Sequence, residues 1–331
     1  MKALLSFASG GPETLRVDEI ADPIAGLGEV LIRVRACGVN YPDLLVIEDK
    51  YQVQPKRPFS PGGEIAGEIV GLGEGVDGFA IGDRILSMVG MGGMAELVAA
   101  PASKCIVIPD EMPFDEGAAF IAAFGTSYHA LKQRGRLAPG ERLLVLGAAG
   151  GMGLAAVELG RAMGAHVIAA VSSEDKLTLA RQHGAAEGFV YPAEISTADP
   201  KALAAIFKSA VGDQGVDIVY DPVGGAYAEA ALRSIAWRGR FLIIGFPAGI
   251  PKIPLNLPLL KGCEMVGVFY GSFFEREPEA NMENVRELFE IYREGKIRPH
   301  ISARMSLEDA ARGFEILASR SAQGKIVIAL N

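Results

Sequence analysis

The first third of the chain alternates apolar and polar residues with a period of two, which is typical of half-buried β-strands. This pattern predicts strands at 29–36, 64–72, 85–89, 95–99 and 105–108. Gly and Pro residues separate these short segments. The pattern therefore predicts a compact, barrel-like β domain in this part of the chain.

After a helix predicted over 116–131, apolar strands alternate with helices. Six strands are predicted at 142–146, 166–171, 188–191, 216–220, 240–244 and 264–270. Several of them are apolar throughout, as expected when helices cover both faces of a parallel sheet. The tail then adds helices at 282–293 and 307–317 and a closing strand at 325–330. The fold class is therefore α/β.

Length and composition narrow the possible functions. The 331 residues correspond to about two domains. The net charge of −8 disfavours broad binding to nucleic acids. The three cysteines lie far apart, so neither a disulfide framework nor a structural zinc site is expected. The longest apolar stretch, 143–157, is shorter than the ~20 residues of a membrane helix, and we expect a cytoplasmic protein with no membrane contact.

The strongest chemical signal is a glycine cluster between a predicted strand and a predicted helix, at 146–153. Gly150 would let the backbone approach a pyrophosphate, and Gly153 would let the helix pack on the strand. The helix N-terminus would supply free N–H groups for phosphates. The first glycine of the usual G-x-G-x-x-G pattern is Ala148 here. The position predicts a dinucleotide site, with a glycine-rich turn without ligand as the alternative.

The second strand of this unit indicates which dinucleotide binds. NAD sites usually place Asp or Glu there, on the ribose hydroxyls. Here the strand ends at the uncharged Ser172, and Lys176 follows one helical turn later. Lys176 could pair with a 2′-phosphate, and Tyr191 ends the next strand nearby, so NADPH is favoured over NADH. In the alternative reading, Lys176 is a solvated lysine and Tyr191 packs on the fold.

Seven motifs carry a resemblance to a known family. They are R-A-C-G-V-N-Y-P-D (35–43), P-F-S-P-G-G-E-I-A-G (58–67), V-D-G-F-A-I-G-D-R-I (76–85), F-G-T-S-Y-H-A-L (124–131), L-G-A-A-G-G-M-G (146–153), Y-D-P-V-G-G (220–225) and Q-G-K-I-V-I (323–328). In the order and spacing of these motifs, the chain resembles the medium-chain dehydrogenase/reductase superfamily, and within it the zinc-independent NADPH:quinone oxidoreductases. The resemblance implies a GroES-like β-rich catalytic domain at 1–121 and a Rossmann NADPH-binding domain at 122–274. A C-terminal segment, 275–331, would complete the catalytic domain.

The zinc alcohol dehydrogenases of this superfamily differ at two positions. Where they carry a Cys, this chain has Asn40, and where they carry a His, it has Gly63 before Glu64. A catalytic zinc needs three protein ligands, and Glu64 alone cannot supply them. We therefore expect no metal, and alcohol oxidation is disfavoured because the Lewis acid is missing. Quinones and activated C=C bonds are electron-poor, so hydride delivery to them depends less on a Lewis acid.

The resemblance also implies roles for individual residues. Asn40 and Asp43 would line the nicotinamide side of the cleft. The sequence shows no clear proton donor: Tyr41, Tyr51 and Tyr270 could each donate, but aromatic side chains near a cleft more often form packing surface. The cofactor would be held by Thr126, Gly150, Gly151, Met152, Ser172, Lys176, Tyr191, Phe246, Phe269 and Tyr270. Simpler structural roles stay open: Asn40 as a turn residue, Asp43 as a helix cap and Thr126 bonded to its own helix.

These observations predict an NADPH-dependent reductase of quinones or α,β-unsaturated carbonyls. A 2-enoyl thioester reductase is an alternative, for which Lys56 and Arg57 could bind a phosphorylated carrier. A non-catalytic NADPH-binding protein is an alternative of another class. The apolar edge strand at 264–271 predicts a homodimer. If the loop at 249–258 covers that edge, the chain would stay a monomer.

Overall fold

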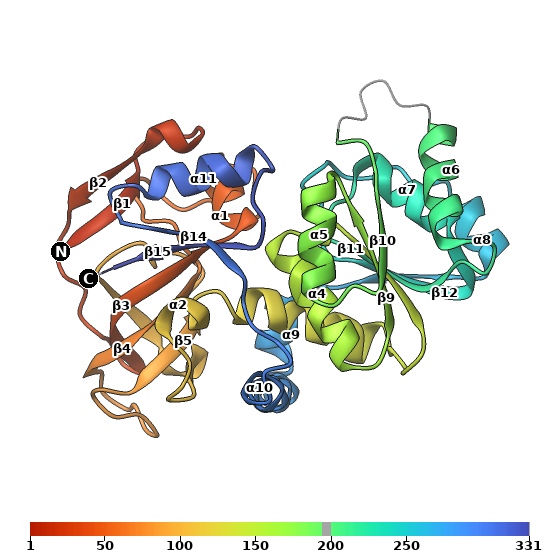
Figure 1. The fold of residues 1–331 in the computed structure, drawn as a ribbon. Coiled ribbons are helices and arrows are strands. Elements are labelled where there is room, and N and C mark those ends of the chain that lie inside the picture. Colours follow the sequence, from red (N-terminus) through yellow and green to blue (C-terminus); the bar gives the residue numbers. More distant parts are fainter. Residues whose placement is uncertain (194–199, 331) are drawn as a thin grey trace. The chain divides into compact units, whose positions relative to one another are not determined.

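The computed structural model describes residues 1–193 and 200–330. The chain forms two compact units (Figure 1). Unit 1 contains Met1–Ala122 and the segment from Pro299 onward, and unit 2 contains Ala123–Arg298. The chain returns to unit 1 at Pro299 rather than at the expected residue 275, because helix α10 (Pro278–Arg293) belongs to unit 2.

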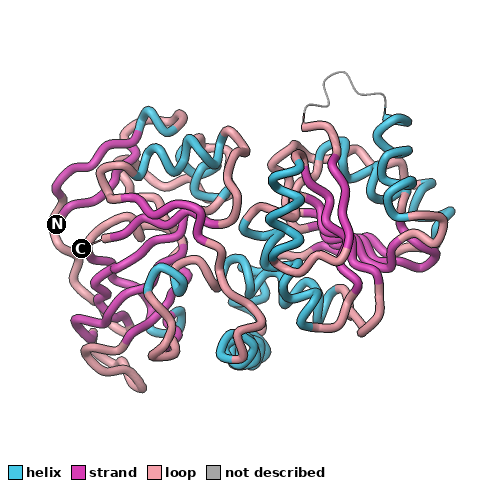
Figure 2. The backbone as a smooth tube through the Cα atoms, in the orientation of Figure 1, coloured by secondary structure: helices cyan, strands magenta, loops and turns pink. Residues whose placement is uncertain are grey.

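Unit 1 is a β-rich domain, as its GroES-like resemblance implies. Its elements are β1 (Lys2–Ser6), η1 (Pro12–Thr14), β2 (Leu15–Glu19), β3 (Glu29–Val39), α1 (Tyr41–Ile47), β4 (Glu64–Leu72), β5 (Arg84–Met88), β6 (Leu97–Pro101), η2 (Ala102–Lys104), β7 (Cys105–Val107), α2 (Phe114–Gly117), β14 (Ile301–Met305), α11 (Ala310–Ala318) and β15 (Lys325–Ala329). The main sheet has the order β14-β15-β3-β4-β5-β7, and β6 also pairs with β3. Figure 2 draws the strands in magenta. Ile32, Ile65 and Ile328 are fully buried in its core.

The register of this sheet joins residues that are far apart in the sequence. The antiparallel pair β3–β4 places Gly38 opposite Glu64, and the antiparallel pair β15–β3 places Ile326 opposite Val39. The first residue of β15, the first residue of β4 and the residue after β3 therefore meet at one end of three neighbouring strands.

Unit 2 is a Rossmann domain with a parallel six-stranded sheet, as predicted. Its elements are η3 (Ile121–Gly125, which begins in unit 1), α3 (Thr126–His129), η4 (Ala130–Arg134), β8 (Arg142–Leu146), α4 (Gly151–Ala162), β9 (His166–Val171), α5 (Glu174–Gln182), β10 (Glu187–Val190), α6 (Pro200–Val211), β11 (Val216–Asp221), α7 (Gly225–Arg233), β12 (Ile235–Ile243), α8 (Asn256–Lys261), β13 (Glu264–Gly267), α9 (Tyr270–Arg276) and α10. The strand order is β10-β9-β8-β11-β12-β13, and every pairing is parallel. The order reverses between β8 and β11, the usual place for a ligand in this fold.

Helices pack on both faces of the unit 2 sheet. Side chains of α6, α7 and α8 join one buried cluster with alternate residues of the strands, such as Leu144 and Ile168. On the other face α4 packs closely, since a Cβ at Gly160 would lie 2.6 Å from Leu143 Cδ2. Both faces are buried, which explains why these strands are apolar throughout.

Some predicted elements have different bounds. The helix expected over 116–131 is divided into α2, the π-helical turn η3, α3 and a second π-helical turn, η4. The predicted last strand of unit 2 ends at Gly267, and Tyr270 begins α9. The strand predicted at 240–244 begins earlier, at Ile235, because α7 ends at Arg233, and Trp237 therefore lies in β12. Among the described residues, no helix combines the length and the apolar character that crossing a membrane requires.

Candidate functional site

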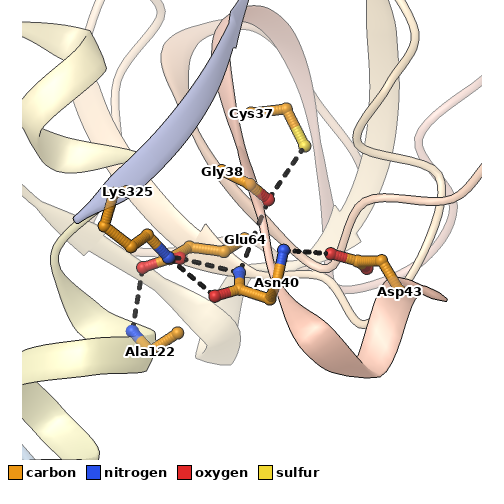
Figure 3. Close-up of polar contacts among 7 residues, drawn as sticks. All are labelled: Cys37, Gly38, Asn40, Asp43, Glu64, Ala122 and Lys325. Atoms are coloured by element: carbon orange, nitrogen blue, oxygen red, sulfur yellow. Dashed lines mark hydrogen bonds and ion pairs between the residues drawn. The ribbon is translucent and has the colours of Figure 1, made fainter. Parts of the chain in front are cut away.

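Unit 1 contains a buried cluster of charged and amide groups, formed by Asn40, Glu64 and Lys325 (Figure 3). The Lys325 ammonium donates to Glu64 Oε2 at 2.9 Å and to Asn40 Oδ1 at 2.6 Å. Asn40 Nδ2 donates to the same Glu64 oxygen at 3.0 Å. The three side chains thus form a closed triangle, which the strand register brings together.

The second carboxylate oxygen of Glu64 is also used. Glu64 Oε1 accepts a hydrogen bond of 2.8 Å from the backbone N–H of Ala122, the last residue of unit 1 before the chain enters unit 2. The side chain of Glu64 is fully buried, and that of Lys325 is 7% exposed. A charge taken out of water at this depth is tolerated only when it is paired and its remaining bonding capacity is satisfied.

Asp43 lies beside this cluster and caps helix α1. Its Oδ2 accepts a 2.8 Å hydrogen bond from the Asn40 backbone N–H, while the Asn40 side chain faces the N–H at position 43. Burial raises the pKa of Asp43 to about 6, although the N–H of Asn40 and the charge of Lys325 oppose this shift. The capping role of Asp43 that the sequence left open is therefore present, and the resemblance-based role beside the nicotinamide stays a prediction.

The cluster does not fit a catalytic zinc. Its members are an ammonium, an amide and one carboxylate, and the carboxylate already serves three donors. A side chain at Gly63 would meet the backbone of Gly90, with its Cβ 3.0 Å from the Gly90 oxygen. In the described part of the chain, no group of three or more His, Cys, Asp or Glu could hold a metal.

The three candidate proton donors have different surroundings. Tyr41 and Tyr51 are half-buried and pack against the core of unit 1. Burial also raises the pKa of Tyr51. Tyr270 is buried in unit 2, where its hydroxyl donates to Asn281 Oδ1 at 2.7 Å. The Tyr270 hydroxyl thus has a structural partner, which leaves Tyr41 and Tyr51 as the accessible candidates.

Unit 2 presents the predicted phosphate loop at the carboxyl end of β8. Gly150 is the extended N-cap of α4, and no side chain caps this helix. The first N–H groups of an uncapped helix have no intrahelical acceptor, so Gly151, Met152 and Gly153 offer free donors and the positive end of the helix dipole. A Cβ at Gly153 would collide with the Gly147 oxygen and lie 2.7 Å from Ala148 Cα, whereas the space around Gly150 is open. This geometry fits a bound pyrophosphate.

The neighbouring strand β9 supplies the residues that the sequence assigned to a 2′-phosphate. Ser172 follows β9 directly, and the Lys176 ammonium donates to Ser172 Oγ at 3.1 Å. Burial lowers the pKa of Lys176. A lysine and a hydroxyl side by side at this strand end fit a phosphate monoester. Tyr191 is only 5% exposed and packs against Phe207 and Tyr227, so its ring also belongs to the core of unit 2.

The remaining predicted cofactor residues lie at the start of α3 and after two strands of unit 2. Thr126 begins α3 and is half-buried. Phe246 follows β12 and is 39% exposed, and Phe269 follows β13 and is 63% exposed. The structure thus leaves both phenylalanines open to contact, and their assignment to the nicotinamide stays a prediction.

Sequence reasoning missed a second network beside the phosphate loop. The buried hydroxyls of Tyr220 and Ser127 lie 2.8 Å apart, and Ser127 Oγ donates to the Met152 carbonyl at 3.5 Å. Asp221 Oδ1 accepts bonds of 2.8 Å from the N–H groups of Val223 and Gly224, and burial raises its pKa to about 6. These bonds fix the loop at Val223, which packs against Gly147. A Cβ added at Gly147 would lie 2.8 Å from Val223 Cγ2.

Sequence reasoning also missed the contacts of Lys325. The sequence shows Lys325 only as part of the closing motif at 323–328, which gives no indication of its partners. From the sequence, Glu64 is a possible metal ligand that has no companion ligands. Both functions depend on the pairing of β15 and β4 with β3.

Comparison with known protein families gives two matches. Residues 26–110 match the alcohol dehydrogenase GroES-like domain, and residues 151–287 match the zinc-binding dehydrogenase family. The two matches correspond to the β-rich unit and the Rossmann unit, in that order.

Individual proteins are similar over nearly the whole chain. A quinone oxidoreductase-like protein 2 homolog from Nematostella vectensis is 36% identical, with 94% of this chain and 84% of that protein covered. Human quinone oxidoreductase is 31% identical, with coverages of 100% and 98%. Escherichia coli quinone oxidoreductase, solved in complex with NADPH, is 27% identical with a TM-score of 0.89 and complete coverage of both chains. A mycobacterial protein solved with NADPH is 29% identical with a TM-score of 0.91, again over all of both chains.

Proposed function

We propose that this chain, which belongs to the quinone oxidoreductase-like family of the medium-chain dehydrogenase/reductase superfamily, reduces a quinone or an α,β-unsaturated carbonyl with NADPH. The observation that carries the proposal is the donor set of the unit 1 cluster. Asn40, Glu64 and Lys325 offer no ligand set for a Lewis-acid metal, so the acceptor must be electrophilic on its own.

The cofactor role of unit 2 follows from its backbone and two side chains. NADPH, when bound, supplies the hydride. The N–H groups at the start of α4 would hold the pyrophosphate, and Lys176 with Ser172 would hold the 2′-phosphate. Relatives solved with NADPH support this choice.

Asn40 can contribute an acceptor rather than a donor. Its Nδ2 protons point to Glu64 at 3.0 Å and to the Gly38 carbonyl at 3.4 Å, while Oδ1 accepts one bond from Lys325. A carbonyl oxygen has two lone pairs. The Asp43 N–H that the Asn40 side chain faces donates to the Asn40 backbone carbonyl at 3.0 Å, so Oδ1 can still accept a second bond. We infer that Asn40 binds a hydroxyl group, on the cofactor ribose or on the substrate.

The thioester alternative is less well supported by the residues that it requires. Arg57 forms an ion pair of 2.9 Å with Asp49 and donates to the Ile47 carbonyl at 2.9 Å. Only Lys56 of the two proposed basic residues is then exposed and available for a phosphorylated carrier. We therefore favour quinones and enones as acceptors.

The test is NADPH oxidation measured against quinones, enones and 2-enoyl thioesters in parallel. We expect turnover with quinones or enones, undiminished after treatment with a chelator. Turnover with thioesters alone would support the alternative reductase. NADPH binding without turnover of any acceptor would support the non-catalytic reading.

We also propose that the chain forms a homodimer through β13. This strand lies at the edge of the sheet, and nearby Trp237, Leu259 and Leu260 are about 70% exposed or more. Val268 N–H already bonds Ile243 inside the unit, so the outward-facing backbone groups are those of Met265 and Gly267. A proline meant to block pairing with a second copy must therefore replace Gly267, because the backbone groups of Val266 and Val268 face β12.

Light-scattering chromatography tests this assembly. We expect a dimer for the wild type and a monomer for Gly267→Pro, since a Cβ at Gly267 meets nothing within 4 Å. Arg134 Nε donates to the Gly267 carbonyl at 3.2 Å, so this arginine shields part of the edge. A wild type that elutes as a monomer at micromolar concentration would contradict the proposal.

A further inference from the structure

We propose that Lys325 is a positioning residue for Asn40: its ammonium fixes the side-chain amide in the one orientation that presents a hydrogen-bond acceptor to the ligand. The proposal rests on the proposed function, because Asn40 is placed in the binding site. By itself, the amide has no preference between its two orientations.

The first argument concerns the two faces of the amide. Oδ1 lies 2.6 Å from the Lys325 ammonium, and Nδ2 lies 3.0 Å from a Glu64 oxygen (Figure 3). A flipped amide would place its N–H groups against the ammonium and its oxygen against the carboxylate. Both contacts would be repulsive, so the charge pair selects one orientation out of two that have nearly the same shape.

The second argument concerns burial. Glu64 is fully buried and Lys325 is 6% exposed as a residue, so water cannot replace the missing bonds if the amide rotates. Charge-assisted hydrogen bonds are about twice as strong as neutral ones, and the low dielectric of the interior strengthens them. The orientation of Asn40 is thus set by the protein before any ligand binds.

The third argument concerns the rigidity of the three anchor points. Lys325 begins β15 and Glu64 begins β4, and both strands pair with β3. Asn40 is fixed at the N-cap of α1 by Asp43. Glu64 is held further by the N–H of Ala122. The backbone leaves little room as well, because a Cβ at Gly38 would collide with the Ala118 oxygen. Groups fixed in this way can bind a ligand without paying an ordering cost on contact.

If the Lys325–Glu64 ion pair only stabilises the fold, a different result is expected. Breaking the pair would then lower stability, and its effect on activity would not depend on Asn40. The two roles are separated by a mutant cycle that combines a change of the Lys325–Glu64 pair with a change at position 40, because coupling between two sites shows that one acts through the other.

The experiment compares wild type, Lys325→Met with Glu64→Gln, Asn40→Ala, and the triple variant. The Met/Gln pair removes both charges, so the fold is not left with a single buried charge, and the new glutamine side chain can still accept from the Ala122 N–H. Lys325→Arg tests rescue by a cation. Arg35→Met serves as a matched control, since it removes the cation of an ion pair between β3 and β4, at 3.0 Å from Glu68 and away from Asn40.

Two readouts are measured. In steady-state kinetics with NADPH and a quinone, we expect kcat/KM to fall about tenfold in the Met/Gln variant and not to fall further when the same change is made in Asn40→Ala. In NMR, hydrogen exchange of the Asn40 side-chain amide, assigned by its loss in Asn40→Ala, should accelerate in the Met/Gln variant and stay slow in Arg35→Met.

The outcomes separate the two proposals. An equal loss of kcat/KM in both backgrounds, or an Asn40 amide that exchanges as in wild type, would overturn the positioning role. If the wild type reduces no acceptor, the proposed function fails, and amide exchange still decides whether Lys325 orients Asn40. Partial recovery of slow exchange in Lys325→Arg would support the role of the cation.

Discussion

The phosphate loop of unit 2 and the charged cluster of unit 1 are built in opposite ways. The loop consists of consecutive residues, 147–153, and its binding groups are backbone N–H groups at the start of α4. The cluster combines side chains from positions 40, 64 and 325, which lie at the ends of three strands that are separate in the sequence. Local geometry is therefore sufficient for the first, whereas the second exists only when the sheet has formed.

The two regions also differ in their energetic cost. Free N–H groups at a helix terminus remain close to solvent and need no compensation before a ligand binds. The buried Lys325–Glu64 pair loses its hydration, and each charge depends on the other. The cluster should accordingly be more sensitive to the removal of one partner than the loop is to small changes.

The largest expected effect is that of Glu64→Ala. It leaves the Lys325 ammonium buried without a carboxylate, and we expect the free energy of unfolding to fall by about 3–5 kcal/mol. Glu68→Ala is the control, because its pair with Arg35 is about one-third exposed and should contribute about 1 kcal/mol or less. Urea unfolding measures both. Equal losses in the two variants would show that burial is not decisive.

In the phosphate region, Lys176→Ala should weaken NADPH binding at least about tenfold. A charge-assisted contact to a phosphate contributes roughly 1.5–3 kcal/mol. NADH lacks the 2′-phosphate, so its affinity should change little and provides the control. Titration calorimetry with both cofactors measures the difference. A wild type that binds NADH as tightly as NADPH would contradict the assignment of Lys176 and Ser172.

Two glycines of the loop should respond differently to alanine. Gly153→Ala places a Cβ against the backbone of Gly147 and Ala148, so we expect a loss of about 1–3 kcal/mol in stability. A Cβ at Gly150 meets only the Gly147 oxygen, at 3.5 Å, so Gly150→Ala should fold normally and lose NADPH affinity instead. Thermal unfolding and cofactor titration distinguish the two. Normal NADPH affinity in Gly150→Ala would argue against close contact with the pyrophosphate.

The last effect concerns pH and is spread over about two pH units. Burial raises the pKa of Asp43 from 3.8 to about 6, so the folded state holds this proton more tightly than the unfolded state. The contribution of Asp43 to stability is therefore present below pH 3.8 and is lost as pH rises towards 6, by about 1 kcal/mol per pH unit. Asp43→Asn should remove this dependence, while the asparagine side chain can still accept from the Asn40 N–H.

Unfolding of wild type and Asp43→Asn between pH 4 and 7 measures the difference. The variant should gain stability relative to wild type as pH rises through this range. Asp221→Asn makes the matching test in unit 2, where burial also raises the carboxyl pKa to about 6. A constant difference between variant and wild type would contradict the raised pKa.

The sequence alone determined the features that depend on neighbouring residues. The six parallel strands follow from apolar segments of strand length, and the phosphate loop follows from glycines between strand and helix. The position of Ser172 and Lys176 after the second strand follows in the same way. In each case the residues that define the feature lie within about ten positions of one another, so hydrophobic periodicity and backbone rules are sufficient.

Only the tertiary structure decided which distant residues share a site. Lys325 and Glu64 lie 261 positions apart and meet because β15 and β4 both pair with β3 in a fixed register. A shift of one residue in either pair would point these side chains to the opposite face of the sheet. Tertiary packing likewise buried Tyr191 and bound the Tyr270 hydroxyl to Asn281. Such contacts depend on the packing of the whole unit, which no local pattern encodes.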